Sequence, residues 1–126
     1  MLLLFTDNLP WAAAAGGAVM LQNALVLGVE NGTFTHNSAG WSGGAVCFRT
    51  EDALEAAFSG TTMQRNSAGD GGGALYSWGP VTLTVDSSAF SENEAGGAAG
   101  AIGVLYARET MIRSTTFESN VAQVLL

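Results

Sequence analysis

The sequence predicts an all-β fold made of stacked coils, because two short motifs alternate along almost the whole chain at a fixed spacing. The asparagines of the Phe-x-x-Asn motif follow one another after 29, 29, 27 and 27 residues, and the Gly-Ala pairs of the Gly-Gly-Ala motif after 27, 29 and 27. Between the motifs apolar and polar residues alternate, most clearly over residues 81–85, as in a strand with one buried face. Together these features predict a single-stranded, right-handed parallel β-helix of about four coils of 27–29 residues.

Each coil is expected to contain three short strands separated by three turns. The first strand carries an inward column five residues before the Phe or Met of the first motif: Val29, Phe58, Val85 and Ile112. The second strand follows Gly-Gly-Ala, and its first inward column is Val19, Val46, Leu75 and Ile102. The third strand is the Phe-x-x-Asn segment, and the alanines two residues after four of the asparagines would form a small inner column: Ala39, Ala68, Ala95 and Ala122. The sequence leaves open whether the Ala of Gly-Gly-Ala faces the core or lines a corner.

Residues 50–58 allow two interpretations. Glu51, Asp52, Leu54, Glu55 and Phe58 are compatible with one or two helical turns. Leu54 and Phe58 also fit the strand columns of the other coils, so an enlarged loop is the favoured interpretation.

The repeated asparagine is the strongest structural candidate in the chain. Asparagine suits a corner because it tolerates left-handed geometry and can bond its own backbone. If the coils lie in register, the amides hydrogen-bond between coils as a ladder, as in other stacked parallel sheets. This ladder would comprise Asn8, Asn37, Asn66, Asn93 and Asn120.

Composition limits the partners of this chain. The net charge is −7, with 11 acidic residues, four arginines and no lysine, which argues against binding to nucleic acid or to an anionic membrane surface. Cys47 is the single cysteine, so we expect a buried thiol and no internal disulfide. Residues 11–29 form an apolar run long enough to cross a bilayer, but they align with residues 41–58, which carry charges. We therefore expect a coil there and no membrane span.

Five partial or complete units form one short stack, so residues 1–126 are expected to form a single β-helix domain. Neither end carries the atypical unit that usually caps a solenoid. We therefore expect a fragment truncated at both ends, whose neighbours are flanking coils of the same longer chain.

The tandem motifs resemble the repeats of the polymorphic outer membrane proteins of chlamydiae. Residues 34–37 and 43–46 match both motifs, whereas Met63 replaces the Phe and Ala99 replaces the first Gly in later coils. The resemblance implies a non-enzymatic stalk, secreted or displayed on the cell surface and associated with the outer membrane in a bacterium. It implies a role in adhesion or display, with a host or neighbour-cell surface protein or glycan as partner, and no cofactor or metal.

Trp11 and Trp41 fall in the same loop of successive coils. Two stacked indoles could form a platform for sugar rings or a protein partner, and packing of a loop against its neighbour is the alternative. The single histidine, His36, has no second metal ligand near it in the sequence and is expected to be exposed.

Two other functions remain open from the sequence. The first is a polysaccharide lyase or glycoside hydrolase of the pectate-lyase-like β-helix superfamily, with an active cleft incomplete in this fragment. Glu30 and Asp86 share an outward column, two coils or about 10 Å apart, but Arg113 would pair with Asp86. The second is an ice-binding solenoid, for which the column Thr33, Thr62 and Thr116 is interrupted by Ala89.

Overall fold

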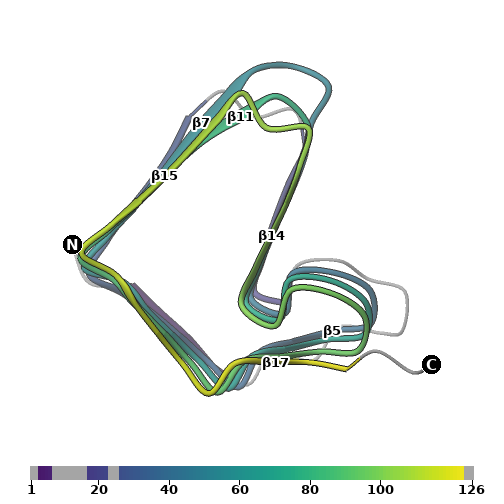
Figure 1. The fold of residues 1–126 in the computed structure, drawn as a ribbon. Helices are drawn as coiled ribbons and strands as arrows, with labels where there is room; N and C mark the ends of the chain where they lie inside the picture. Colours follow the sequence, from purple (N-terminus) through teal and green to yellow (C-terminus); the bar gives the residue numbers. More distant parts are fainter. Residues whose placement is uncertain (1–2, 7–16, 23–25, 124–126) are drawn as a thin grey trace.

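The computed structural model describes residues 3–6, 17–22 and 26–123, and the description below concerns these residues. They form seventeen β-strands and no helix. Figure 1, a view along the stack, shows that successive coils superimpose, with three long sides and an additional lobe next to β5 and β17. The prediction of an all-β parallel β-helix of about four coils is therefore confirmed.

The strands form four sheets in which every pairing is parallel. Sheet A contains β1 (Leu3–Thr6), β4 (Gly32–Thr35), β8 (Thr62–Gln64), β12 (Ala89–Ser91) and β16 (Thr116–Glu118). Sheet B contains β2 (Val19–Gln22), β6 (Val46–Arg49), β10 (Leu75–Trp78) and β14 (Ile102–Leu105). Sheet C contains β3 (Val26–Glu30), β7 (Leu54–Ser59), β11 (Val81–Asp86) and β15 (Glu109–Arg113). Sheet D contains β5 (Ser38–Ala39), β9 (Ser67–Ala68), β13 (Glu94–Ala95) and β17 (Val121–Ala122).

Each coil that the structure describes in full thus has four strands, and the prediction of three was wrong. The additional strands are those of sheet D, which contain two residues each. Two residues cannot display an alternating pattern, so a strand this short gives no periodic signal in the sequence. The alanines of sheet D do form the expected inner column, since Ala39, Ala68 and Ala95 are buried.

The strand register matches the predicted columns. Val29, Phe58, Val85 and Ile112 are successive partners in sheet C. Val19, Val46, Leu75 and Ile102 are successive partners in sheet B. These columns meet the rings of Phe34 and Phe90 from sheet A in one continuous apolar core.

Residues 50–58 begin with a bend and continue as strand β7 from Leu54 onward. Leu54, Ala56 and Phe58 point into the core, and Glu55 and Ala57 point outward. The loop interpretation is therefore confirmed, and the helical alternative is wrong.

The Gly-Gly-Ala motif forms the corner that leads into sheet B. Gly43 and Gly72 have φ angles of 68° and 64°, in the left-handed region that favours glycine. The second glycine approaches the next coil closely, since a Cβ on Gly44 would lie 2.1 Å from the carbonyl oxygen of Gly73. Ala45 is fully buried in the core, which answers the question that the sequence left open.

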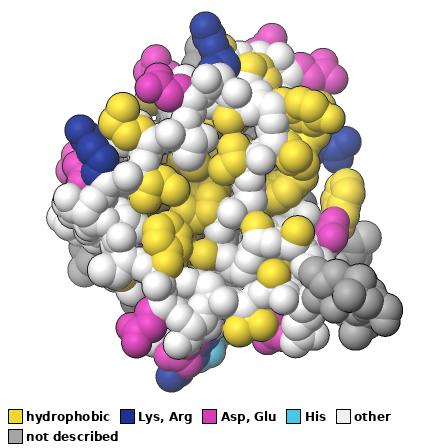
Figure 2. All heavy atoms as spheres, in the orientation of Figure 1, with side chains coloured by type: hydrophobic (Ala, Val, Ile, Leu, Met, Phe, Trp, Pro, Cys, Tyr) yellow, Lys and Arg dark blue, Asp and Glu magenta, His cyan; other side chains and the backbone are white. Residues whose placement is uncertain are grey.

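The coil that contains β14 to β17 ends the described stack and exposes part of its apolar face. Figure 2 views this face and shows hydrophobic side chains gathered at its centre. Ile112 and Phe117 are 42 % and 46 % exposed, although they continue columns that are buried elsewhere. In the apolar run of residues 11–29, residues 19–22 and 26–29 are β-strand. No helix among the described residues is long and apolar enough to cross a bilayer.

Candidate functional site

The structure brings the four described asparagines of the predicted ladder into one column, while Asn8 lies outside the described residues. The amide Nδ2 of Asn37 donates to Oδ1 of Asn66 at 3.1 Å. The same contact links Asn66 to Asn93 at 3.0 Å and Asn93 to Asn120 at 2.9 Å. The asparagines therefore form a continuous ladder along the stack axis.

Each amide of the ladder also bonds the backbone. Oδ1 of Asn66 accepts the backbone N–H of Asn37 at 3.1 Å, and Nδ2 of Asn66 donates its second hydrogen to the carbonyl oxygen of Phe34 at 3.0 Å. Asn93 repeats this pattern with Asn66 and Met63. Because both groups of a fully buried amide are satisfied, the ladder links neighbouring coils without the cost of an unpaired polar atom.

The local role expected for the asparagines was wrong in one respect. The left-handed residue at this corner is the one before each asparagine: His36, Arg65, Glu92 and Ser119, with φ between 54° and 56°. The asparagine itself bonds the adjacent coils and not its own backbone. His36 is exposed, as expected.

A second column of polar contacts lies at the corner between sheets C and A. The hydroxyl of Ser88 accepts the backbone N–H of Thr61 at 3.1 Å and donates to the carbonyl oxygen of Asp86 at 2.8 Å. Thr115 repeats this arrangement, accepting from the backbone N–H of Ser88 at 3.3 Å. The sequence analysis missed this hydroxyl ladder, although its spacing of 27 residues repeats that of the asparagines.

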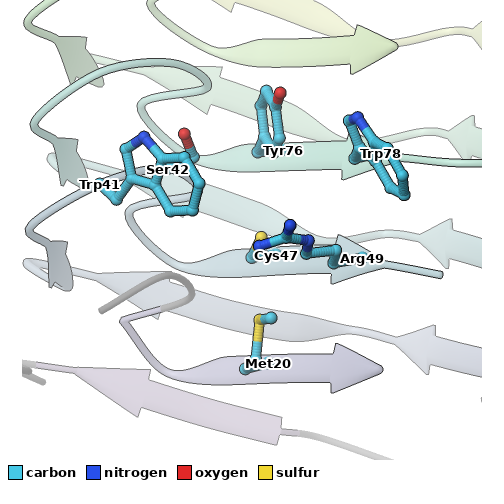
Figure 3. A pocket seen from close by; sticks show the side chains of 7 residues that line it. All are labelled: Met20, Trp41, Ser42, Cys47, Arg49, Tyr76 and Trp78. Atoms are coloured by element: carbon cyan, nitrogen blue, oxygen red, sulfur yellow. The ribbon is translucent and has the colours of Figure 1, made fainter. Parts of the chain in front are cut away.

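The outer face of sheet B carries the best candidate for a binding site. A hollow of about 170 Å³ is lined by Met20, Trp41, Ser42, Cys47, Arg49, Tyr76 and Trp78. Figure 3 shows Trp41 and Ser42 on the loop before β6, and the other side chains on β2, β6 and β10. Met20, Cys47 and Tyr76 are register partners, so they form one column along the sheet.

Arg49 occupies the centre of this aromatic surface. Its Cζ atom lies 5.7 Å from the ring centroid of Trp41 and 5.7 Å from that of Trp78, so both indoles make cation–π contacts with the guanidinium. Tyr106 packs edge-on against Trp78 with a centroid distance of 5.9 Å and extends the aromatic surface. Trp41 is 48 % exposed and Tyr106 76 %, so the surface remains open to solvent.

Cys47 forms the floor of the hollow. Its side chain is buried, and this burial raises the pKa of the thiol to about 11. Burial also raises the pKa of the Tyr76 hydroxyl above its ordinary value. The thiol is therefore protonated at neutral pH and acts as a small apolar group, as the sequence predicted.

Two further hollows adjoin the first. One of about 260 Å³ shares Arg49 and Trp78 and is also lined by Gln22, Thr50 and Glu51. The other, of about 280 Å³, shares Tyr76 and reaches Asp70 and Leu105. The first hollow thus shares side chains with each of the other two, and we call the three adjacent hollows together the aromatic groove.

The predicted platform of Trp11 and Trp41 is only partly described, because Trp11 lies outside the described residues. Trp41 faces Arg49 on the strand that follows its own loop, together with Trp78 from the next coil. The sequence analysis overlooked Arg49, Tyr76 and Trp78. The sequence contained a signal for them: these three residues occupy the positions of β6 and β10 that alternate with core residues, and such positions face outward.

The acidic side chains are distributed over several faces. Arg113 pairs with Asp86 at 3.6 Å, as predicted, and Arg65 pairs with Glu92 at 3.0 Å. The hydrogen bond from Arg65 lowers the pKa of the exposed Glu92 carboxyl. Within the described part of the chain, no three His, Cys, Asp or Glu side chains are grouped so that they could hold a metal ion.

The threonine column of sheet A is present in register, as Thr33, Thr62 and Thr116. Ala89 takes the intervening place, so the hydroxyls do not form a regular array.

Part of the chain matches a known family of repeats. Residues 31–49 match the model of the Chlamydia polymorphic membrane protein repeat, a repeat of chlamydial outer membrane proteins. The matched segment contains both motifs of one coil, from the corner before β4 to the end of β6, and confirms the resemblance seen in the sequence. No curated protein and no solved structure gave a significant match.

Proposed function

We propose that this chain is a non-enzymatic module of an extracellular or cell-surface protein, associated with the outer membrane if the source is bacterial. It acts as a stalk whose outer face carries an adhesive groove. The observation that carries this proposal is the match of residues 31–49 to a repeat of chlamydial outer membrane proteins, together with the coil stack that the repeat builds.

The stalk role is supported by how the coils are joined. The buried amides of Asn66 and Asn93 bond both to the neighbouring amide and to backbone groups of the neighbouring coil. Bending or shearing the stack would break these bonds at every coil, because each amide serves two coils at once. A column joined in this way resists deformation and can hold a binding face at a distance from its anchor.

The adhesive role is supported by the aromatic groove. Trp41 and Tyr106 are large, exposed aromatic side chains on one face, and such residues are enriched at binding surfaces. We propose a surface protein or a glycan of a host or neighbouring cell as the partner.

The exposed apolar face that includes Ile112 and Phe117 supports a related proposal. In the intact protein, a further coil of the same repeat would pack on this face and continue the columns of buried side chains.

Localisation tests the proposed function. Antibodies raised against the purified chain would be applied to intact and to permeabilised source cells, with an antibody to a cytoplasmic protein as the permeability control. We expect equal labelling of intact and permeabilised cells, and loss of the signal after intact cells are treated with protease. Labelling only after permeabilisation would contradict the proposal.

A further inference from the structure

We infer that the aromatic groove binds a glycan in which a single carboxylate-bearing sugar is linked to neutral sugars. This inference names the ligand class for the adhesive part of the proposed function, and binding by the purified protein can be measured without reference to cellular location. Four features of the groove lead to it.

The first feature is shape. The hollow of about 170 Å³ shares Arg49 and Trp78 with the one of about 260 Å³ and shares Tyr76 with the one of about 280 Å³, so the three lie next to one another on an open face. Each is smaller than the roughly 300 Å³ at which pockets for single drug-sized ligands begin. A chain molecule that places one ring in each hollow fits this form better than one compact ligand does.

The second feature is the aromatic lining. Trp41 and Tyr76 flank the central hollow with Trp78, and the hydroxyl of Ser42 adds a hydrogen-bonding group. Sugar rings have apolar C–H faces that stack on aromatic rings and hydroxyl edges that bond polar groups. The lining offers both kinds of contact, because indole and phenol rings combine an apolar body with a polar tip.

The third feature is the isolated cation. The two salt bridges among the described residues use Arg65 and Arg113, so Arg49 takes part in neither. Its guanidinium lies against two indoles, and among the described residues it donates no hydrogen bond to a partner. A planar guanidinium with free donors matches a carboxylate, which can accept two parallel hydrogen bonds.

The fourth feature limits the charge of the ligand. Glu51 lines the hollow on one side of the centre, and Asp70 lines the hollow on the other side. These carboxylates would repel a second or third acidic sugar, and the net charge of −7 adds to this at low ionic strength. The groove therefore favours one acidic sugar at Arg49 with only neutral sugars in the rest of the chain, and it disfavours polyanionic chains.

Calorimetric titration of the purified chain at 150 mM salt tests the inference, with 3′-sialyllactose, lactose and a heparin tetrasaccharide as probes. We expect sialyllactose to bind at least about tenfold more tightly than lactose, because a hydrogen-bonded charge pair contributes roughly this factor. The heparin tetrasaccharide should bind more weakly than sialyllactose.

Three variants make the test specific. Arg49→Gln should lower the affinity for sialyllactose to that for lactose, and Trp41→Ala should weaken the binding of both. Arg65→Gln changes the net charge equally but lies at the corner between sheets A and D, so it should leave both affinities unchanged. Because Trp41, Arg49 and Arg65 are all exposed, these variants should fold.

Several outcomes would overturn the inference: no binding of either sugar, equal affinity for sialyllactose and lactose, tighter binding of heparin, or an unchanged preference in Arg49→Gln. None of these outcomes bears on surface exposure, which is measured on cells. A failed titration with positive labelling would therefore reject the ligand class and leave the surface location standing.

Discussion

Asn66 and Asn93 are joined by two hydrogen bonds that share one acceptor. Oδ1 of Asn93 accepts both Nδ2 and the backbone N–H of Asn66, each at 3.0 Å. Both residues are fully buried, so each bond lies where an unpaired polar group is costly. One side chain therefore fixes the spacing between two coils as well as the path of the backbone at the corner.

The first prediction concerns this ladder. Asn66→Ala removes the oxygen that accepts both the backbone N–H and the side-chain Nδ2 of Asn37, and it removes the Nδ2 that donates to the carbonyl oxygen of Phe34. We expect the free energy of unfolding in urea to fall by about 3 kcal/mol or more, since each buried group left unpaired costs about 1–3 kcal/mol. Asn120→Ala, in the half-exposed end coil, is the matched control and should cost about 1 kcal/mol. Equal losses for the two variants would contradict the role assigned to burial.

The second prediction concerns the corner before sheet B. Ala99 replaces the first glycine of its motif but keeps the left-handed conformation, with a φ of 62°. This conformation costs a residue with a Cβ about 1–2 kcal/mol, and replacing that residue by glycine removes the cost. Glycine also makes the unfolded chain more flexible, which offsets part of the gain in stability. Ala99→Gly should therefore raise the free energy of unfolding by about 0.5–1 kcal/mol. The reverse change, Gly72→Ala, should lower it by more, because the new Cβ would lie 2.3 Å from the carbonyl oxygen of Leu75.

The features that could be predicted from the sequence are those that repeat. The columns through Val46 and Val85 and the register of the asparagines follow from the spacing of two motifs, because equal spacing places equal residues above one another. The strands of sheet D could not be predicted because they are too short to show a period. The left-handed residues before the asparagines could not be predicted either, because their side chains point outward and differ in every coil.

The aromatic groove was missed for the opposite reason. Its lining depends on residues that differ from coil to coil: Arg49 in β6 is followed by Trp78 in β10 and Leu105 in β14. Comparing coils to find a repeat emphasises what they share and discards such differences. In a solenoid the shared positions build the scaffold, and the outward positions that vary are the better place to look for a ligand site.

The third prediction tests the close approach of neighbouring coils. A Cβ on Gly44 would lie 2.1 Å from the carbonyl oxygen of Gly73 and 2.6 Å from the backbone nitrogen of Ser67. Because these atoms belong to backbone, they cannot turn away, and Gly44→Ala should destabilise the fold by several times the roughly 1 kcal/mol of an ordinary substitution. Gly28→Ala is the control, since a Cβ at this exposed strand position meets nothing within 4 Å. It should leave the thermal midpoint unchanged or raise it slightly.

The fourth prediction concerns a buried hydroxyl. Oγ of Ser77 has no hydrogen-bond partner among the described residues, and it lies between Phe48 and Val104 in the inward column of sheet B. Ser77→Ala removes this unpaired group, and we expect the free energy of unfolding to rise by about 1 kcal/mol. Ser88→Ala is the matched control, because its hydroxyl donates one hydrogen bond and accepts another. That variant should lose stability, and a gain of stability there would contradict the argument.

The fifth prediction concerns the pH dependence introduced by Cys47. Burial raises the pKa of its thiol from 9.0 to about 11, so between these values the folded state keeps a proton that the unfolded state has lost. The contribution of this group to stability is therefore complete below about pH 9 and declines as the pH rises toward 11. Urea unfolding at pH 8, 9 and 10 should show a steeper loss of stability for the natural chain than for Cys47→Ala, which lacks the group but keeps Tyr76. Parallel curves would show that the thiol ionises as readily in the folded chain as in the unfolded one. Alkylation by iodoacetamide at pH 8 provides an independent measurement, and it should be slow in buffer and fast in urea.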